Sequence, residues 1–100
     1  MIIRYTSDAR NDLEEITQHI RAASPSGARK VARRIRSIIE LLKSHPRAGR
    51  ATEVAGIRRL VASPYPYLIF YEVAENAVVI HAIRHGARNP NEMPGASGNA

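Results

Sequence analysis

The fold is decided by the stretch SPYPYLIFYEVAENAVVIHAIRH, which spans residues 63–85. Pro64 and Pro66 exclude a helix at its start, because proline fixes φ and has no N–H to donate. The segments that follow, 67–73 and 78–83, are rich in the β-branched and aromatic residues that strands favour. The stretch therefore predicts a β-hairpin with a tight turn between its two strands.

A two-residue turn at Glu75-Asn76 sets the register of this hairpin. The register pairs apolar and aromatic residues on one face: Val73 with Val78, Tyr71 with Ile80, and Ile69 with Ala82. We expect helices to cover that face. The opposite face, which we expect to be partly open, carries Leu68, Phe70 and Glu72 on one strand and Val79, His81 and Ile83 on the other.

Two amphipathic helices are predicted before these strands. The first follows a cap at Ser7 or Asp8, whose side chains can accept a hydrogen bond from a free amide. Its apolar stripe recurs at helical spacing: Ala9, Leu13, Ile16 and Ile20. The second begins at Ser24-Pro25, a cap followed by proline at the first helical position, and ends before His45-Pro46. Its apolar stripe consists of Val31, Ile35, Ile38, Ile39 and Leu42.

These elements predict a single α+β domain with the order β-α-α-β-β-β. Residues 1–6 and 57–62 supply two further short strands. Because a short turn joins the two helices, we expect a helical hairpin packed on one face of a small antiparallel sheet. The domain is expected to cover residues 1–90, and residues 91–100, rich in proline, glycine and polar residues, are expected to form a mobile tail.

Positive charge is concentrated in one third of the chain. The net charge is +6, and residues 29–59 carry ten cations against two carboxylates. Such a block predicts an acidic partner, either a nucleic acid or an acidic protein segment. A solvated basic helix face is the alternative explanation.

Composition excludes several classes of protein. The chain has no cysteine, which rules out disulfides and cysteine metal sites. Its longest apolar runs are too short to span a membrane, and its first residues do not resemble a signal peptide, so a cytoplasmic location is expected. The four histidines are not spaced as metal ligands. No cofactor is indicated.

Arginines and histidines near the strands are the candidate site residues. Arginine suits an anionic ligand because its planar fork holds two oxygens at once. Neighbouring strand residues point to opposite faces, so Arg84 and His85 are not expected in one site. The candidate catalytic residues are Arg58, Arg84 and His85. The candidate residues for binding a partner or target are Arg47, Arg50, Arg58, Arg84 and Arg88.

Two other polar side chains are expected to have structural roles. Tyr71 is predicted to lie in the core with its hydroxyl group hydrogen-bonded. His81 lies between apolar residues in the middle of a strand, so we expect a partly buried histidine with a hydrogen-bond partner.

The order of several segments resembles the RelE/ParE superfamily of bacterial type II toxins. The resemblance covers about residues 2–90 and rests on DLEEI (12–16), LKSHPRAGR (42–50), GIRRLV (56–61), YPYLIFYEV (65–73) and IRHGAR (83–88). It implies a small toxin encoded beside an acidic antitoxin. The antitoxin would neutralise the toxin by wrapping an extended segment over its surface, in a toxin–antitoxin hetero-oligomer.

The resemblance implies one of two activities. RelE-like members cleave mRNA in the ribosome without metal, whereas ParE-like members poison DNA gyrase. RelE-like nucleases often carry an arginine early in the penultimate strand, where this chain has Leu68. The tail after Arg88 also lacks a tyrosine or histidine to act as acid or base. The ending RHGAR (84–88) looks more like the ParE-like and plasmid-stabilisation branches.

The favoured interpretation is therefore a ParE-like toxin that inhibits an essential target such as DNA gyrase. One alternative is a ribosome-dependent mRNA endoribonuclease. A second alternative is a nucleic-acid-binding module without toxicity, for which the basic block of residues 29–59 would suffice.

Overall fold

The computed structural model describes residues 1–86, which form two helices and one five-stranded sheet. The elements are β1 (Ile2–Tyr5), α1 (Ser7–Ala23), α2 (Pro25–Leu41), β2 (Arg50–Ala51), β3 (Ile57–Val61), β4 (Tyr67–Val73) and β5 (Ala77–His85). The predicted α+β class and helical hairpin are confirmed. The two-residue strand β2 lies in a segment predicted as loop. The expected domain boundary at residue 90 and the expected tail at 91–100 lie outside the described residues.

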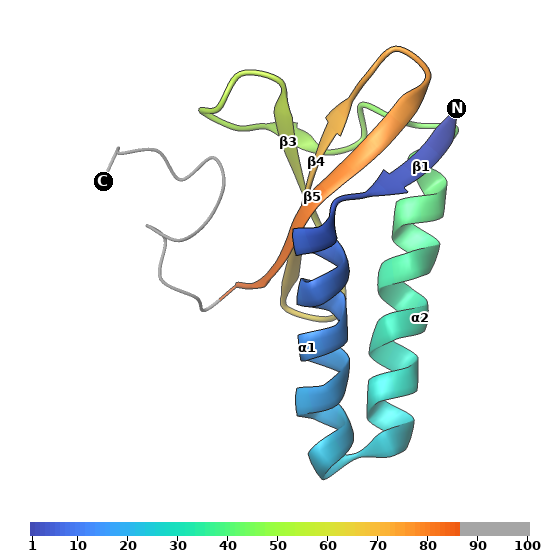
Figure 1. The fold of residues 1–100 in the computed structure, drawn as a ribbon, viewed down its shortest axis with the longest axis vertical. Helices are drawn as coiled ribbons and strands as arrows, with labels where there is room; N and C mark the ends of the chain where they lie inside the picture. The colour runs from blue at the N-terminus through green and yellow to red at the C-terminus, as the bar shows by residue number, and fades with distance from the viewer. Residues whose placement is uncertain (87–100) are drawn as a thin grey trace.

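The turn between the helices depends on Ser24. Its backbone N–H donates to the carbonyl of Ile20 at 2.7 Å and so ends α1. Its side-chain oxygen accepts from the N–H of Gly27 at 3.0 Å and so begins α2, with Pro25 in the first turn as predicted. Because one residue serves both helix ends, α1 and α2 turn back on each other and lie side by side (Figure 1).

The sheet has the strand order β1-β5-β4-β3-β2. Three of the four neighbouring pairs are antiparallel, as expected, but β1 runs parallel to β5. The sheet is therefore mixed rather than purely antiparallel. The chain between β1 and β5 contains both helices and three strands, so it is long enough to make a parallel neighbour possible. The apolar pattern of a four-residue strand specifies which residues are buried and carries no information about strand direction.

A β-bulge in β5 changes part of the predicted register. The pairs next to the turn, Val73 with Val78 and Tyr71 with Ile80, are confirmed. Beyond them the register shifts, and Ile69 lies opposite Ile83 instead of Ala82. The extra residue is His81, which the bulge leaves without a partner across the strands. The two apolar residues Ile80 and Ile83 thereby both reach the helix-covered face, although three positions separate them.

The core lies between this face of the sheet and the helical hairpin (Figure 1). Both predicted helix stripes contribute to it, with Ile16 and Ile20 packed at its border. The larger side chains that are fully buried in it are Ile35, Ile39 and Leu42 from the helical hairpin and Ile69, Tyr71, Val78, Ile80 and Ile83 from the sheet. Among residues 1–86, no helix is long and apolar enough to cross a membrane.

Burial of tyrosines predicts that the fold loses stability in alkali. Desolvation by burial raises the pKa of Tyr5, Tyr67 and Tyr71 above the ordinary tyrosine value of 10.0. Below pH 10 the folded and unfolded chains both keep these protons. As the pH rises past 10 the unfolded chain releases them first, so the free energy of unfolding falls.

Urea unfolding followed by circular dichroism at several pH values from 8 to about 11 measures this loss. Tyr67→Phe removes one titrating group and is expected to make the alkaline decline shallower. A free energy of unfolding that stays constant across this range would contradict the prediction.

Candidate functional site

A hydrogen-bonded corner joins the loop after α2 to the sheet. The hydroxyl group of Tyr71 on β4 donates to the carbonyl of Pro46 at 2.8 Å and accepts from the N–H of Gly49 at 2.8 Å. Burial raises the pKa of Tyr71, while the Gly49 N–H and the charge of Arg58 act in the opposite direction. The expectation of a buried tyrosine with a bonded hydroxyl is confirmed.

Arg58 on β3 belongs to the same corner. Its Nη1 donates to the carbonyl of Gly49 at 2.6 Å and lies 3.5 Å from the carbonyl of Arg47. Arg58 lies opposite Tyr71 in the sheet register, so it shares the helix-covered face with that tyrosine. Its guanidinium group therefore holds the loop in place instead of extending over the open face.

Gly49 allows the loop to approach the sheet this closely. A Cβ atom at this position would lie 2.8 Å from the backbone carbonyl of Arg59 and 2.8 Å from the ring and hydroxyl of Tyr71. These distances are too short for any side chain, so the corner requires glycine here.

A second cluster forms where β1 ends and leaves the edge of β5 uncovered. Asp12 on α1 is 7% exposed and occupies this edge. Its Oδ2 accepts from the backbone N–H of Ile83 at 3.0 Å, and its Oδ1 accepts from Nη1 of Arg84 at 2.7 Å. Within the described part of the chain, Nε of Arg84 is buried without a hydrogen-bond partner. The carboxylate thus accepts hydrogen bonds from a strand amide and from Nη1 of a partly buried guanidinium group.

Arg84 and His85 point to opposite faces, as predicted from strand geometry. Arg84 lies opposite Leu68, whereas His85 lies opposite Tyr67 on the helix-covered side. The rings of His85 and Tyr67 meet edge to face with 5.2 Å between their centroids. A groove of about 360 Å³ opens beside them, lined by Asp12, Glu15, Ile16, His19, Tyr67, Ile83 and His85.

The side chain of His81 pairs with a carboxylate outside both clusters. Its Nε2 lies 2.7 Å from Oε1 of Glu72, on the face away from the helices. The expected partly buried and partnered histidine is confirmed. Within residues 1–86, no three histidine, aspartate or glutamate side chains lie together as a metal ion would need.

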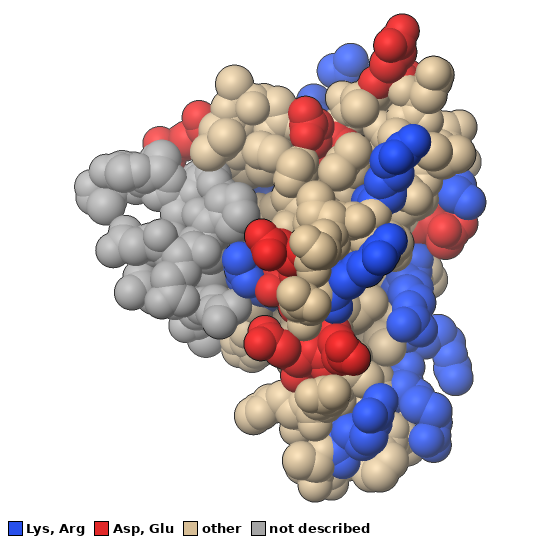
Figure 2. Space-filling model, viewed as in Figure 1, with Lys and Arg blue, Asp and Glu red and all other residues tan. Residues whose placement is uncertain are grey.

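Exposed arginines gather along the helical hairpin. Figure 2 shows a band of lysine and arginine side chains down the side of the molecule formed by α2. Two adjoining hollows of about 510 and 410 Å³ run between α1 and α2 and share Thr17, Arg21 and Arg36. We call this double hollow the arginine furrow. Five arginines line it: Arg10, Arg21, Arg29, Arg33 and Arg36.

Comparison with known proteins gives consistent matches. Residues 3–90 match the family model described as the ParE toxin of the type II toxin–antitoxin system parDE. The chain belongs to this ParE toxin family. It is 39% identical over 84 residues to "Toxin RelE2" of Caulobacter vibrioides, a match covering 84% of this chain and 93% of the relative.

Two further proteins are similar to this ParE-family chain. "Putative toxin Y4kP" of Sinorhizobium fredii is 31% identical over 78 residues, which cover 78% of this chain and 81% of the relative. A solved structure titled "Chromosomal ParDE TA system from P. aeruginosa" superposes with a TM-score of 0.77 at 27% identity, covering 85% of this chain and 95% of that one. The sequence matches and the structural match therefore all point to toxins of toxin–antitoxin systems.

The ParE-family fold does not unite the candidate residues in one site. Arg58 belongs to the corner on the helix-covered face. Arg84 lies on the other face of the sheet and is paired with Asp12 of α1 at the edge of β5. Arg47 and Arg50 are exposed beside the corner. Arg88 lies outside the described residues. The structure therefore does not bring Arg58 and Arg84 together.

The sequence reasoning missed Asp12 and Gly49. A signal for Asp12 was present, because it stands between Ala9 and Ile16 at helical spacing and so lies on the apolar stripe, where a carboxylate needs a partner. Gly49 gave no comparable signal, since a glycine is necessary there only because Tyr71 and the backbone carbonyl of Arg59, both distant in sequence, approach it closely.

Removing the Tyr71 hydroxyl should destabilise this ParE-family toxin. Tyr71→Phe leaves the Gly49 N–H and the Pro46 carbonyl without their partner, which should lower the free energy of unfolding by about 1–3 kcal/mol. Urea unfolding measures the difference. Tyr65→Phe removes a hydroxyl outside the corner and is the control, with an expected change within about 0.5 kcal/mol. Equal effects of both variants would contradict the assigned role of the corner.

The two partners of the Asp12–Arg84 pair should differ in their effect on stability. Asp12→Ala leaves the Arg84 guanidinium and the Ile83 N–H without their partner. It should lower the free energy of unfolding by about 2–4 kcal/mol. Arg84→Ala keeps the bond to the Ile83 N–H and should cost less.

A double-mutant cycle with urea unfolding measures the coupling, expected to exceed about 0.5 kcal/mol. Glu15→Ala, an exposed carboxylate on the same helix, serves as control. Additive effects of the two substitutions would show that the pair is not coupled.

Proposed function

We propose that this toxin acts by binding DNA gyrase and that a cognate acidic antitoxin neutralises it in a hetero-oligomer. The observation that carries the proposal is the engagement of Arg58 and Arg84 inside the fold. Arg58 donates to the Gly49 carbonyl at 2.6 Å, and Arg84 is paired with Asp12 at 2.7 Å. Metal-free RNA cleavage needs cations directed at a phosphate, and these two are directed at the protein itself.

Contact with the target is assigned to the exposed side chains beside the corner. Arg47 and Arg50 flank Gly49, and both are solvent-exposed. Arg58 acts as a positioning residue, because it donates hydrogen bonds from β3 to two carbonyl groups of this loop. The corner thus presents two cations on a fixed backbone, which lowers the entropy lost when a partner binds.

The similarity to the ParDE system supports the antitoxin as partner. The net charge of +6 favours an acidic segment as the part of the antitoxin that makes contact. We place the complex in the cytoplasm, where gyrase and DNA are found.

A ribosome-dependent mRNA endoribonuclease is the second candidate. It is favoured by the 39% identity to a protein named "Toxin RelE2". The groove beside His85 and Tyr67 would then be its active site, with imidazole as acid or base. A binding module without toxicity remains the third candidate, supported only by the basic helix face.

Inhibition of gyrase tests the proposal. Purified toxin, added in increasing molar excess to DNA gyrase, relaxed plasmid and ATP, is expected to block negative supercoiling. Relaxation by a type I topoisomerase, which serves as the control reaction, should be unaffected. Arg47→Glu/Arg50→Glu should weaken the inhibition without changing the unfolding midpoint, whereas Arg58→Met should lower both.

Primer extension on mRNA from a translation reaction separates the candidates. Intact message together with blocked supercoiling agrees with the proposal. New cleavage ends in the message with normal supercoiling would replace it by the endoribonuclease. No effect in either assay, and no growth arrest on induction, would favour the module without toxicity.

A further inference from the structure

We infer that the outward side of α2 is a binding site for the phosphate backbone of duplex DNA. Three exposed cations form this surface, which we call the basic ridge: Lys30, Arg33 and Arg34. Duplex DNA is expected to bind the ridge in the absence of any other protein. That the toxin meets this DNA in a complex with gyrase rests on the proposed function.

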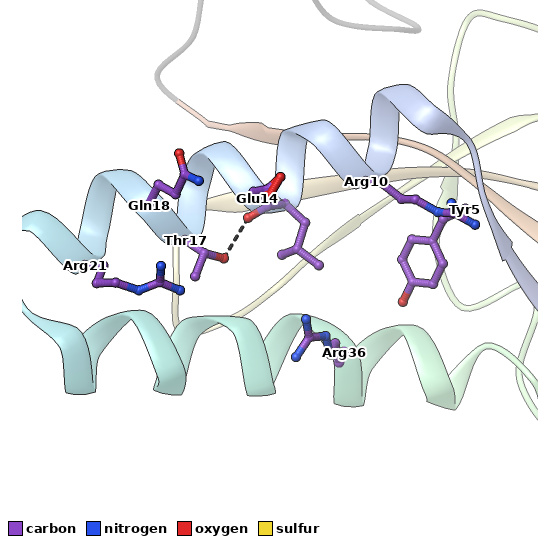
Figure 3. Close-up of a pocket in the computed structure, with 8 residues that line it drawn as sticks. Tyr5, Arg10, Glu14, Thr17, Gln18, Arg21 and Arg36 are labelled. Carbon is purple, nitrogen blue, oxygen red and sulfur yellow. Dashed lines mark hydrogen bonds between the residues drawn. The ribbon is translucent and has the colours of Figure 1, made fainter.

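The basic ridge faces solvent, whereas the furrow lies between the helices. Ile35 is fully buried in the core, and Lys30 and Arg33 stand five and two positions before it, on the opposite side of the helix. Lys30 and Arg34 do not line the furrow, although Arg33 borders both surfaces. Figure 3 shows Arg36, by contrast, in the space between α1 and α2.

The charges of the basic ridge are unfavourable for α2 itself. Lys30 is three positions from Arg33 and four from Arg34, and like charges at these spacings repel one another on a helix surface. The first turn of α2 has no acidic residue and its last turn has no basic residue, so the helix lacks the charges that its dipole favours. An anionic partner would relieve the repulsion and so explains why the cations gather here.

Carboxylates of the protein do not neutralise the ridge. Residues 25–39 contain neither aspartate nor glutamate. The ion pairs among residues 1–86 join other side chains: Lys43–Glu40, His81–Glu72 and Arg84–Asp12. Arg34 is fixed in position, because its Nε donates to the carbonyl of Ser63 at 2.6 Å. A guanidinium group has five N–H donors, so this bond leaves donors of Arg34 for a ligand.

The composition of this side of α2 favours a phosphate backbone over a peptide. Between residues 26 and 37 the exposed side chains are all polar: Ser26, Arg29, Lys30, Arg33, Arg34, Arg36 and Ser37. An amphipathic peptide would find no apolar surface to cover here. Cations and hydroxyl groups are the side chains that contact phosphates in protein–DNA complexes.

The same composition favours a duplex over a single strand. α2 contains no aromatic residue, so unpaired bases would have nothing on which to stack. The cations from Arg29 to Arg36 extend over about 10 Å of helix axis. Duplex DNA carries about six phosphate charges over that length. Phosphate contacts do not read bases, so we expect binding that is independent of DNA sequence.

The ridge lies close in the chain to the corner that we assign to the target. α2 ends at Leu41, and the loop that carries Arg47 and Arg50 follows it. Gyrase acts on duplex DNA, so a toxin bound to gyrase has DNA within the same complex. Because two linked contacts bind more tightly than either contact alone, we expect DNA to strengthen the binding of the toxin to gyrase.

Fluorescence anisotropy with a labelled DNA duplex of about 20 base pairs tests the inference at several salt concentrations. The full-length toxin is titrated without gyrase and is expected to bind. Lys30→Gln/Arg33→Gln should weaken binding about tenfold and reduce the slope of log K against log salt by about two, because two phosphate contacts are lost. Thermal unfolding checks that this ridge variant folds. Its midpoint should be equal or higher, since glutamine favours helix and the repulsion is reduced.

The matched control is Arg4→Gln/Arg59→Gln. It makes the same change in net charge at two exposed strand positions outside the ridge. The control should keep the salt slope and most of the affinity for the duplex. If the ridge variant melts early, the single substitution Lys30→Gln replaces it, with an expected reduction of the slope by about one.

Binding of labelled toxin to gyrase, measured with and without unlabelled duplex DNA, tests the link to the target. DNA should tighten the binding of the wild-type toxin about tenfold or more and should have little effect on the ridge variant. Equal binding of the wild-type toxin with and without DNA would contradict this link. If the toxin neither binds nor inhibits gyrase but still binds the duplex through the ridge, the proposed function fails and the DNA site stands.

Three results would overturn the DNA site. The first is absence of binding to the duplex at about 50 mM salt. The second is an equal loss of affinity in the ridge variant and in the control, which would show attraction by net charge alone. The third is tighter, ridge-dependent binding of single-stranded DNA, duplex RNA or a glutamate-rich peptide of matched charge, which would assign the ridge to a different partner.

Discussion

The fold depends on how α1 covers the part of the β5 edge that β1 is too short to reach. β1 ends at Tyr5, and side chains from the start of α1 then take over the exposed edge. The Thr6 hydroxyl donates to the carbonyl of His81 at 3.2 Å, and the Asp12 carboxylate accepts from the N–H of Ile83 at 3.0 Å. Unpaired backbone groups at a buried edge are costly, so these two bonds fix the position of α1. The helical hairpin, the core and the groove near His85 follow from that position.

The same constraint decides which cations remain available to partners. Once Asp12 is held at the edge of β5, it binds Arg84, while the corner around Tyr71 binds Arg58. Both arginines become parts of the framework. Among residues 1–86, the other exposed cations lie on both helices, in the loop beside Gly49 and on strands, where Arg4 and Arg59 are examples.

Much of the fold followed from local patterns in the chain. The hairpin turn, the cap and proline at Ser24-Pro25 and both apolar stripes depend on the conformational preferences of neighbouring residues, and all of them are present in the structure. The predicted register of the hairpin was wrong only beyond His81, where the β-bulge lies. A bulge depends on packing against the helices, which the local sequence does not show. The candidate site was predicted less well, since side-chain partners such as Asp12 and Arg84 are 72 positions apart in the chain.

By itself, the sequence determined the class of the fold, the apolar faces of the helices, the concentration of positive charge and the resemblance to the RelE/ParE superfamily. Only the tertiary structure decided that β1 runs parallel to β5, that Arg58 and Arg84 lie on opposite faces, and that five arginines line one furrow. The physical reason is the distance along the chain over which each effect acts. Periodicity and capping act within a few residues, whereas strand direction, ion pairing and grooves arise when distant segments are packed together.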